Sequence, residues 1–202
     1  MHPNPAFGWA DRKAMLDFAA HHSFAHIFTA SGSGQFVVHA PLLVREQRIL
    51  FHVAKRNRIA DALDGRPVLI SILGRHAYHS ANWYVSEDQV PTWHYEAVEI
   101  EGAARRVSDE ELVVLVDQLA DVMEKRFSPD HPWTRAKMGP GRFEAMTKAI
   151  VGFEVEPSEI RGTRKFNQHK NEADVEATIS GQRAAGRPDI VEAIEEARLR
   201  GK

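Results

Sequence analysis

The sequence predicts a mainly β protein of the α+β class, in which helices surround an antiparallel barrel of six or seven strands. Short strand-like segments follow one another with links of only a few residues, which indicates a meander. Short strands in hairpin connections, with helices inserted between them and at the ends, favour a barrel or sandwich over a parallel sheet. The strand-like segments are residues 24–30, 35–44, 48–54, 68–73, 90–107 and 151–160.

Local signals support individual strands. The Ser-Gly-Ser-Gly sequence at residues 31–34 is typical of a hairpin turn between the first two strands. Pro41 lacks a backbone N–H, so it predicts a bulge or an unpaired position in the second strand. Val98 and Ile100 alternate with glutamates, which is the period-two pattern of a half-buried strand.

The best-defined helix begins after Ser108. The hydroxyl of Ser108 and the carboxylate of Glu111 fit a capping box, and apolar residues then recur at helical spacing to about Arg126. We expect residues 1–180 to form one domain and residues 181–202 to form a C-terminal helical extension. Further helical segments are predicted at residues 11–22, 55–65, 142–150 and 189–200.

The composition is that of an ordinary globular protein. The 202 residues are 43% hydrophobic and 27% charged, which is typical of this class. The formal net charge of -2 gives no electrostatic reason to approach nucleic acid or an anionic membrane. No apolar run approaches the ~20 residues of a membrane span, and the N-terminal residues lack a signal-peptide pattern. We therefore expect a cytoplasmic protein without a membrane segment.

Several common kinds of catalytic site have no support in the sequence. There is no cysteine, which excludes disulfides, thiol chemistry and cysteine-ligated metal. His39 and His52 lie on successive strand candidates and could meet, but no carboxylate has an evident place as a third metal ligand. The sequence shows no readable Ser-His-Asp order, no carboxylate pair in an apolar setting and no G-x-G-x-x-G motif after a strand. We expect no metal site, and the catalytic residues stay unknown.

A basic cluster follows the third strand. Lys55, Arg56 and Arg58, with Asn57 between them, fall at the predicted start of a short helix. Free amides and the positive end of the helix dipole both favour an anion at such a place, above all a phosphate. For any one of these cations, solvated surface charge is the simpler explanation. The cluster as a whole favours phosphate binding.

An aromatic and polar stretch suggests a flat ligand. Buried Trp and Tyr side chains need partners for their N–H and O–H groups, and a flat conjugated ligand needs ring faces together with a few donors and acceptors. Core packing explains single members of the stretch, but it explains the crowding less well. The stretch contains Tyr78, Ser80, Asn82, Trp83, Tyr84, Trp93, His94 and Tyr95.

The most basic decapeptide of the chain is residues 161–170, expected directly after the last strand. Three interpretations stay open: a solvated tail, a cap over an anionic ligand, or a contact with nucleic acid.

With these segments in view, the chain resembles the PaiB-type family of FMN-binding negative transcriptional regulators. That family shares the FMN-binding split barrel of pyridoxamine-phosphate-oxidase-like flavoproteins. The resemblance runs from the N-terminus to about residue 180, and the tryptophan-containing segment 90–95 is its most specific part. It rests on the segments 37–44, 51–57, 74–84, 90–102 and 149–168, and on their order and spacing.

The resemblance implies a homodimer that binds flavin mononucleotide (FMN) in clefts at the subunit interface. It implies that His39 lies alongside the flavin ring, that residues 92–95 line the site, and that His52 with residues 55–57 reaches the phosphate. One departure is His94, because an asparagine is usual at that position. The cofactor-binding residues implied in this way are His39, His52, Lys55, Arg56, Asn57, Tyr78, Ser80, Thr92, Trp93, His94, Lys165 and Gln168.

Three functions are compatible with these features. The first is an FMN-binding split-barrel protein with a regulatory role. The alternative is a flavin-dependent oxidoreductase or reductase of the pyridoxamine-phosphate-oxidase-like class without direct DNA binding, since the flavin would supply the redox chemistry. The third is a DNA-binding repressor, but no helix-turn-helix with a basic second helix is readable, and the helix at 109–126 is acidic. The sequence therefore favours indirect regulation.

Overall fold

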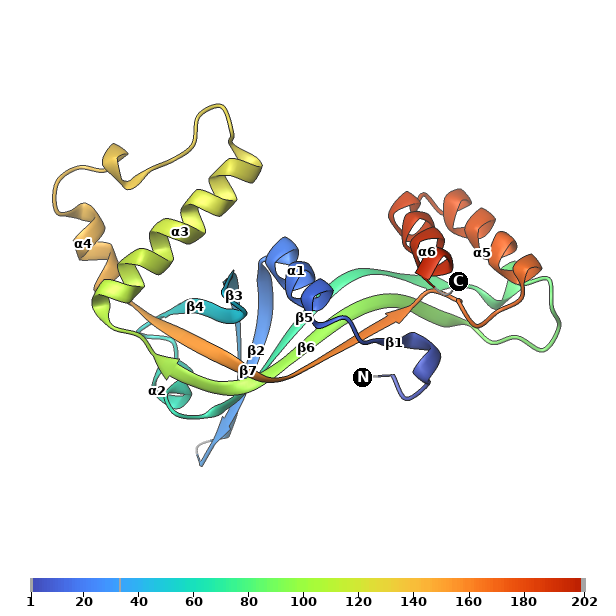
Figure 1. Cartoon of the computed structure of the whole chain (residues 1–202), viewed down its shortest axis with the longest axis horizontal. Helices are drawn as coiled ribbons and strands as arrows, with labels where there is room; N and C mark the ends of the chain where they lie inside the picture. Colours follow the sequence, from blue (N-terminus) through green and yellow to red (C-terminus); the bar gives the residue numbers. More distant parts are fainter. Residues whose placement is uncertain (1, 33, 201–202) are drawn as a thin grey trace. The chain divides into compact units, whose positions relative to one another are not determined.

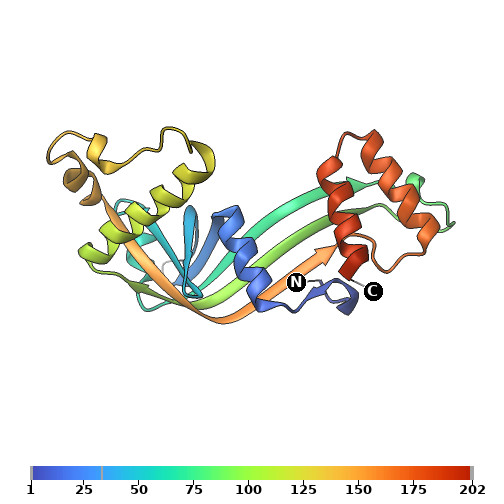
Figure 2. The same cartoon turned by 45° about the horizontal axis from the view of Figure 1, so that its top comes forward.

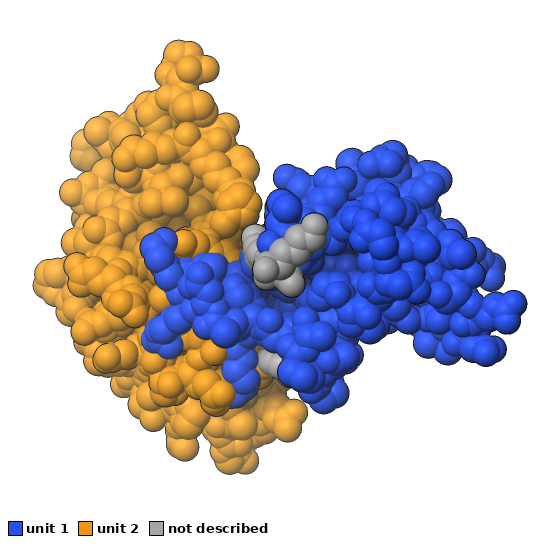
Figure 3. Space-filling model, turned by 45° about the vertical axis from the view of Figure 1, so that its right-hand side comes forward, with its two compact units in different colours: residues 1–15, 73–98, 161–202 blue, residues 16–72, 99–160 orange. Residues whose placement is uncertain are grey.

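The computed structural model describes residues 2–32 and 34–200 (Figure 1). The chain divides into two compact units, which Figure 3 shows in different colours. Unit 1 comprises residues 1–15, 73–98 and 161–202, and unit 2 comprises residues 16–72 and 99–160.

Seven strands form one sheet in the order β1-β7-β4-β3-β2-β5-β6, and β7 also pairs with β6. Six strands therefore close into a hydrogen-bonded ring, with β1 added beside β7. This arrangement confirms the predicted antiparallel barrel. The strands are β1 (Gly8–Trp9), β2 (Phe24–Ser31), β3 (Gly34–Arg45), β4 (Arg48–Ala54), β5 (Pro67–His79), β6 (Thr92–Arg106) and β7 (Ile150–Lys165).

The hairpins of unit 2 follow from their turn residues. Ser31 pairs with Gly34, which confirms the predicted turn, although its residue 33 lies outside the described part of the chain. Glu46 and Gln47 link β3 to β4 with positive φ angles of 49° and 70°, as tight two-residue hairpins require. Pro41 pairs with β2, whereas pairing between β3 and β4 begins only at the next residue. Pro41 has no partner residue on β4, so its missing N–H removes no hydrogen bond between β3 and β4.

The core of unit 2 includes an apolar cluster between α3 (Asp109–Phe127) and the strands. The predicted capping box is present, because Ser108 Oγ accepts from the N–H of Glu111 and the carboxylate of Glu111 accepts from the N–H of Ser108. A Cβ on Gly152 would lie only 2.6 Å from Val107 Cγ2, so glycine lets β7 approach this cluster closely. The buried members of the cluster are Leu43, Leu50, Val107, Leu112, Leu115 and Leu119.

In unit 1, α5 (Glu172–Ala184) and α6 (Pro188–Arg200) lie side by side (Figure 1, Figure 2). They share a core with β5 and with the chain that leaves β7. The sequence predicted α6 but not α5, whose apolar positions are few and are separated by polar residues. The buried residues of this core are Ala77, Phe166, Val175, Ile179, Ile190, Val191, Ala193 and Ile194.

Two strand boundaries differ from the prediction. The strand predicted to end at residue 73 continues as β5 to His79. The last strand, β7, continues to Lys165, so residues 161–165 lie within it rather than after it. Both strands are long because they run through both units. The predicted domain boundary after residue 180 stays a prediction; it falls within α5, and residues 201–202 lie outside the described part.

The other helical segments are short apart from α1. Three of them, α1, α2 and α4, fall within predicted helical segments, although α2 begins later than predicted, and the 3-10 turns η1, η2 and η3 were not predicted. They are η1 (Pro5–Phe7), α1 (Arg12–His22), α2 (Ala60–Leu63), η2 (Ala81–Trp83), η3 (Arg135–Lys137) and α4 (Arg142–Thr147).

Candidate functional site

The basic residues predicted to bind phosphate lie in unit 2, in a turn at the end of β4. Residues 55–59 form this turn and α2 begins only at Ala60, so the prediction of a helix start at Lys55 is wrong. The backbone N–H groups of Lys55 and Asn57 already donate to carbonyl oxygens, each over 2.9 Å. The positive charge of the turn is therefore carried by side chains rather than by free amides.

The three cations of this turn are not equivalent. Lys55 and Arg56 are exposed and form no ion pair with any residue that the structure describes. Arg58 instead lies over Phe36, with its Cζ atom 5.1 Å from the ring centre, and it lines a pocket of about 640 Å³ with Arg66. Two exposed, unpaired cations suit the dianionic phosphate of a mononucleotide.

His52 precedes the turn on β4 and is partly buried. Its Nδ1 atom is buried without a hydrogen-bond partner among the described residues, and burial lowers the pKa of the ring. β4 pairs with β3 only as far as Phe51, opposite Leu42, but it pairs with β7 through Ala54. The strand thus leaves β3 at His52, which places an unsatisfied imidazole where the sheet splits.

His39 lies on an exposed face of β2 and β3. It pairs with His26, and the two rings meet edge to face with their centroids 4.7 Å apart. The next pair on this face is Phe28 opposite Val37, which are 40% and 44% exposed. The predicted ring contact at His39 therefore lies in an exposed apolar and aromatic surface.

In unit 1, Tyr78 and Trp93 form an exposed aromatic surface on β5 and β6. Tyr78 is 50% exposed and Trp93 is 54% exposed, and their rings meet edge to face with the centroids 6.1 Å apart. The ring of His76 lies 6.4 Å from that of Trp93. Ser80 follows β5 directly, and its hydroxyl accepts a hydrogen bond from the N–H of Asn82 over 3.3 Å. These side chains offer ring faces to a flat ligand.

His94 lies on the opposite face of β6, where it is fully buried. Its ring stacks on that of His79 with the centroids 4.8 Å apart, and no nitrogen of either ring has a hydrogen-bond partner among the described residues. Burial lowers the pKa of His94 to about 3 and that of His79 to about 4. Successive residues of a strand point to opposite faces, so Trp93 and His94 do not contribute to one surface.

The remaining predicted residues of unit 1 are held in hydrogen bonds. Lys165 Nζ donates to Thr92 Oγ1 over 2.6 Å, so these two are brought together. Gln168 Nε2 donates to the carbonyl oxygens of Ala6 and Arg164, and its Oε1 accepts from the N–H of Phe166. Gln168 thereby fixes the chain as it leaves β7.

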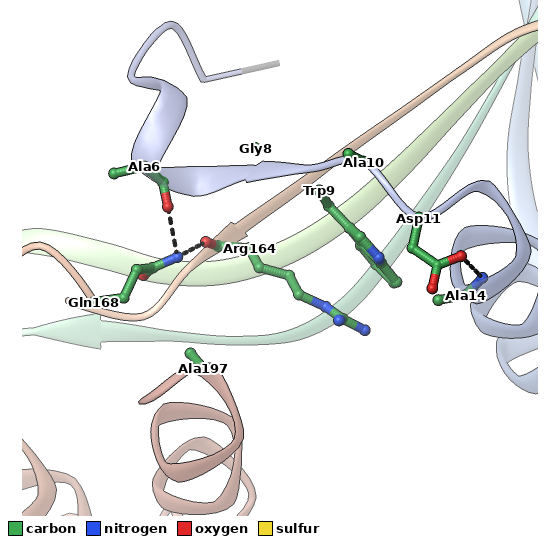
Figure 4. A pocket seen from close by; sticks show the side chains of 9 residues that line it. All are labelled: Ala6, Gly8, Trp9, Ala10, Asp11, Ala14, Arg164, Gln168 and Ala197. Atoms are coloured by element: carbon green, nitrogen blue, oxygen red, sulfur yellow. Dashed lines mark hydrogen bonds between the residues drawn. The ribbon is translucent and has the colours of Figure 1, made fainter. Parts of the chain in front are cut away.

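A pocket of about 500 Å³ in unit 1 was not predicted from the sequence (Figure 4). Arg164 projects into it from β7 and lies against the indole of Trp9, with 3.3 Å between Arg164 Cζ and the ring centre. Trp9 lies on β1 and Arg164 on the partner strand β7. The sequence does not predict this contact. Trp9 and Arg164 are far apart in the sequence, and nothing in their residue types or spacing indicates that β1 pairs with β7.

Among residues 2–32 and 34–200, no group of three or more histidines and carboxylates could hold a metal ion. No helix within the described ranges has the length and apolar character needed to cross a membrane.

Comparisons with known proteins agree with the flavin chemistry. The sequence model of the family described as "Putative FMN-binding domain" matches residues 1–159. "Protease synthase and sporulation protein PAI 2" of Bacillus subtilis is 30% identical over 175 residues, which are 83% of this chain and 82% of that protein. The chain belongs to this PaiB-type FMN-binding family. The resemblance drawn from the sequence is therefore confirmed, and FMN is the cofactor of the family.

Solved structures share the fold of this PaiB-type chain. An FAD and haem binding protein from Mycobacterium smegmatis superimposes with a TM-score of 0.59 at 13% identity, over 78% of this chain and 73% of that one. A flavocytochrome from Azotobacter vinelandii gives a TM-score of 0.59 at 12% identity, over 82% and 72% of the two chains. Because the sequence identities are this low, the structural likeness establishes the split-barrel fold alone.

The residues present fit FMN. Its phosphate requires positive charge, which the unpaired Lys55 and Arg56 side chains carry. Its ring requires flat apolar surface, which the exposed Trp93 and Tyr78 rings present. Of the twelve predicted residues, five lie in unit 2 and seven in unit 1. Direct contacts join Tyr78 with Trp93 and Thr92 with Lys165, whereas His94 is buried on the opposite face of β6.

Proposed function

We propose that this PaiB-type protein binds FMN, with the FMN phosphate on Lys55, Arg56 and Asn57 of unit 2. The observation that carries the proposal is the pair of exposed, unpaired cations in the turn after β4. Unpaired arginine and lysine side chains bind a phosphate without first breaking an internal ion pair. Bound FMN supplies electron or hydride transfer, and the residues of the chain bind and orient it.

His52 supports the same assignment. A buried ring nitrogen without a partner costs free energy, and a ligand that accepts or donates a hydrogen bond there relieves that cost. Its position three residues before Lys55 on β4 places it beside the proposed phosphate-binding turn. Because burial lowers its pKa, His52 acts as a neutral hydrogen-bonding group at pH 7.

We further propose that the protein is a homodimer. The support is the exposed face of β2 and β3, where Phe24, Phe28 and Val37 are 55%, 40% and 44% exposed. These three side chains lie on the same face because Phe24 pairs with Pro41 and Phe28 with Val37. Contiguous exposed apolar side chains on a sheet mark an interaction surface, and a second copy of this chain is the partner that the family resemblance implies.

We propose that any regulatory role does not use the basic segment 161–170 to bind DNA. Arg164 is engaged with Trp9 and lies 3.4 Å from the carboxylate of Glu96. Lys165 donates to Thr92, and Lys170 Nζ donates to Gln89 Oε1 over 2.5 Å. Cations held in this way do not form a surface that tracks a phosphate backbone.

The phosphate site is tested by reversing its charge. The double variant Lys55→Glu, Arg56→Glu places two anions where the phosphate binds, so we expect at least a hundredfold weaker FMN binding, about 2.7 kcal/mol. FMN is titrated into apo-protein and followed by visible absorbance and flavin fluorescence, with circular dichroism to check the fold.

The matched control is the double variant Arg106→Glu, Arg142→Glu, which makes the same change of charge at two other exposed cations of unit 2. It should bind FMN like the parent protein. Equal FMN affinity in the folded Lys55 and Arg56 variant would show that the phosphate binds elsewhere.

A further inference from the structure

The pocket beside Trp9 in unit 1 has the dimensions of a small-molecule site. Its volume is about 500 Å³, within the roughly 300–1,000 Å³ typical of ligand pockets. Small residues leave this space open and Arg164 reaches into it (Figure 4). The lining residues are Ala6, Gly8, Trp9, Ala10, Asp11, Ala14, Arg164, Gln168 and Ala197.

Arg164 is a cation whose hydrogen-bonding capacity is incompletely used. Glu96 is almost fully buried, and its carboxylate is bound mainly by Arg75, whose Nε lies 2.7 Å from Glu96 Oε1. Arg75 also pairs with Glu196 over 2.9 Å and with Glu192 over 3.8 Å, so three carboxylates surround it. Arg164 approaches Glu96 only through its buried Nε, which lies 3.4 Å from the second carboxylate oxygen without making a hydrogen bond.

The guanidinium of Arg164 is held in place before any ligand arrives. Its face lies against the indole of Trp9, and Gln168 bonds the carbonyl oxygen of Arg164 over 2.5 Å. A Cβ on Gly162 would lie 2.8 Å from Trp9 Cβ, so glycine allows the indole to pack closely on β7. A fixed planar guanidinium recognises a carboxylate through its fork of N–H donors.

The second charge of the pocket restricts the ligand further. Asp11 lines the same pocket, and its carboxylate accepts the N–H of Ala14 over 3.0 Å. A carboxylate in the wall disfavours a ligand with several negative charges, whereas a single carboxylate beside Arg164 is tolerated. The alanine and indole walls favour a flat, apolar body on that ligand.

We propose that this pocket binds a small planar monocarboxylate through Arg164, as a second ligand site besides the one for FMN. The carboxylate completes the hydrogen bonds of the guanidinium, and the flat body of the ligand packs on Trp9 and the alanine wall.

Isothermal titration calorimetry with benzoate tests the site, with benzamide as the neutral analogue of the same shape. We expect benzoate to bind and benzamide to bind at least tenfold more weakly. Arg164→Gln should abolish benzoate binding, while Arg183→Gln, which removes an exposed arginine of α5 in the same unit, should leave it unchanged. Ala14→Leu, which fills the pocket without changing its charge, should also abolish binding and covers the case in which Arg164→Gln fails to fold.

The titrations are run on FMN-free and FMN-saturated protein, and we expect the same benzoate affinity in both. Displacement of benzoate by FMN, equal binding of benzamide, or no heat at benzoate concentrations of about 10 mM would each overturn the proposal. Failure of FMN to bind at all would overturn the proposed cofactor site and leave the benzoate result to be judged on its own.

Discussion

At the scale of single residues, the most unusual feature is the buried imidazole pair of unit 1. His79 and His94 are both fully buried and stack on each other, and their four ring nitrogens lack partners among the described residues. Burial favours the neutral form of each ring, which is why both pKa values fall. The pair is therefore compatible with the fold only while it is uncharged.

This pair makes the stability of the protein sensitive to acid. Above pH 6.5 both rings are neutral in the folded and the unfolded chain, so they add no pH dependence. Below pH 6.5 the unfolded chain takes up protons that the folded chain does not, until the pH reaches the folded values of about 4 and about 3. Over that range each ring lowers the free energy of unfolding by about 1.4 kcal/mol for every unit by which the pH falls.

Replacing His94 by asparagine, His94→Asn, removes one of these titrating groups. We expect the dependence of unfolding free energy on pH, measured by urea denaturation between pH 4 and pH 6.5, to become less steep. The control is His131→Asn at an exposed position of unit 2. The same slope in His94→Asn and in the parent protein would contradict the inference that His94 is neutral when folded.

At the scale of elements, α5 depends on one contact that its sequence does not reveal. Gly181 lies in the middle of the unit 1 packing, and a Cβ there would be 2.4 Å from Cδ2 of the Trp83 indole. The neighbouring Gln182 donates to the carbonyl oxygen of Tyr78 over 3.0 Å. The helix is therefore held against the end of β5 and the segment after it by both packing and hydrogen bonding.

A single methyl group should disturb this contact. Gly181→Ala favours the helix by propensity, but the clash with Trp83 should lower the free energy of unfolding by about 1–3 kcal/mol. Thermal and urea unfolding measure the change, and Ser180→Ala, at an exposed position of the same helix, should have little effect. A stabilised Gly181→Ala protein would show that helix propensity outweighs the clash.

At the scale of the whole molecule, the exposed apolar face of β2 and β3 predicts self-association. Phe28→Asp puts a charge in the middle of this face, and its desolvation in an interface is costly. Light scattering should therefore give the parent protein twice the 22.7 kDa of one chain and the variant a single chain.

Phe127→Asp provides the control, because Phe127 is a 72% exposed aromatic residue at the end of α3. It should leave the dimer intact. A parent protein of one-chain mass, or a dimeric Phe28→Asp variant, would refute the proposed role of this face.

Much of the fold was predictable because its signals are local. The cap at Ser108, the apolar repeat of α3 and the alternation around Val98 each depend on residues close in the sequence, and the structure confirms these elements. The same alternation already implied that Trp93 and His94 point to opposite faces of β6. Which face is buried was not predictable, because the helices that cover it come from the far end of the chain.

The candidate site, like the fold, was predictable from the sequence only where its signals are local. Lys55 and Arg56 were recognisable as a charge cluster, but the turn that presents them could not be distinguished from a helix start by composition alone. The pocket at Trp9 and Arg164 had no sequence signal, because it depends on the pairing of β1 with β7.

By itself, the sequence determined the class of this protein: strands in antiparallel hairpins, a helix with a defined start, and the flavin-binding family. Periodicity, caps and charge clusters act over a few residues, so they can be recognised without coordinates. Only the tertiary structure decided which side chains lack partners: the exposed Lys55 and Arg56, the buried His79 and His94, and the incompletely bonded Arg164. The physical reason is that solvation and pairing depend on neighbours that are distant in the sequence.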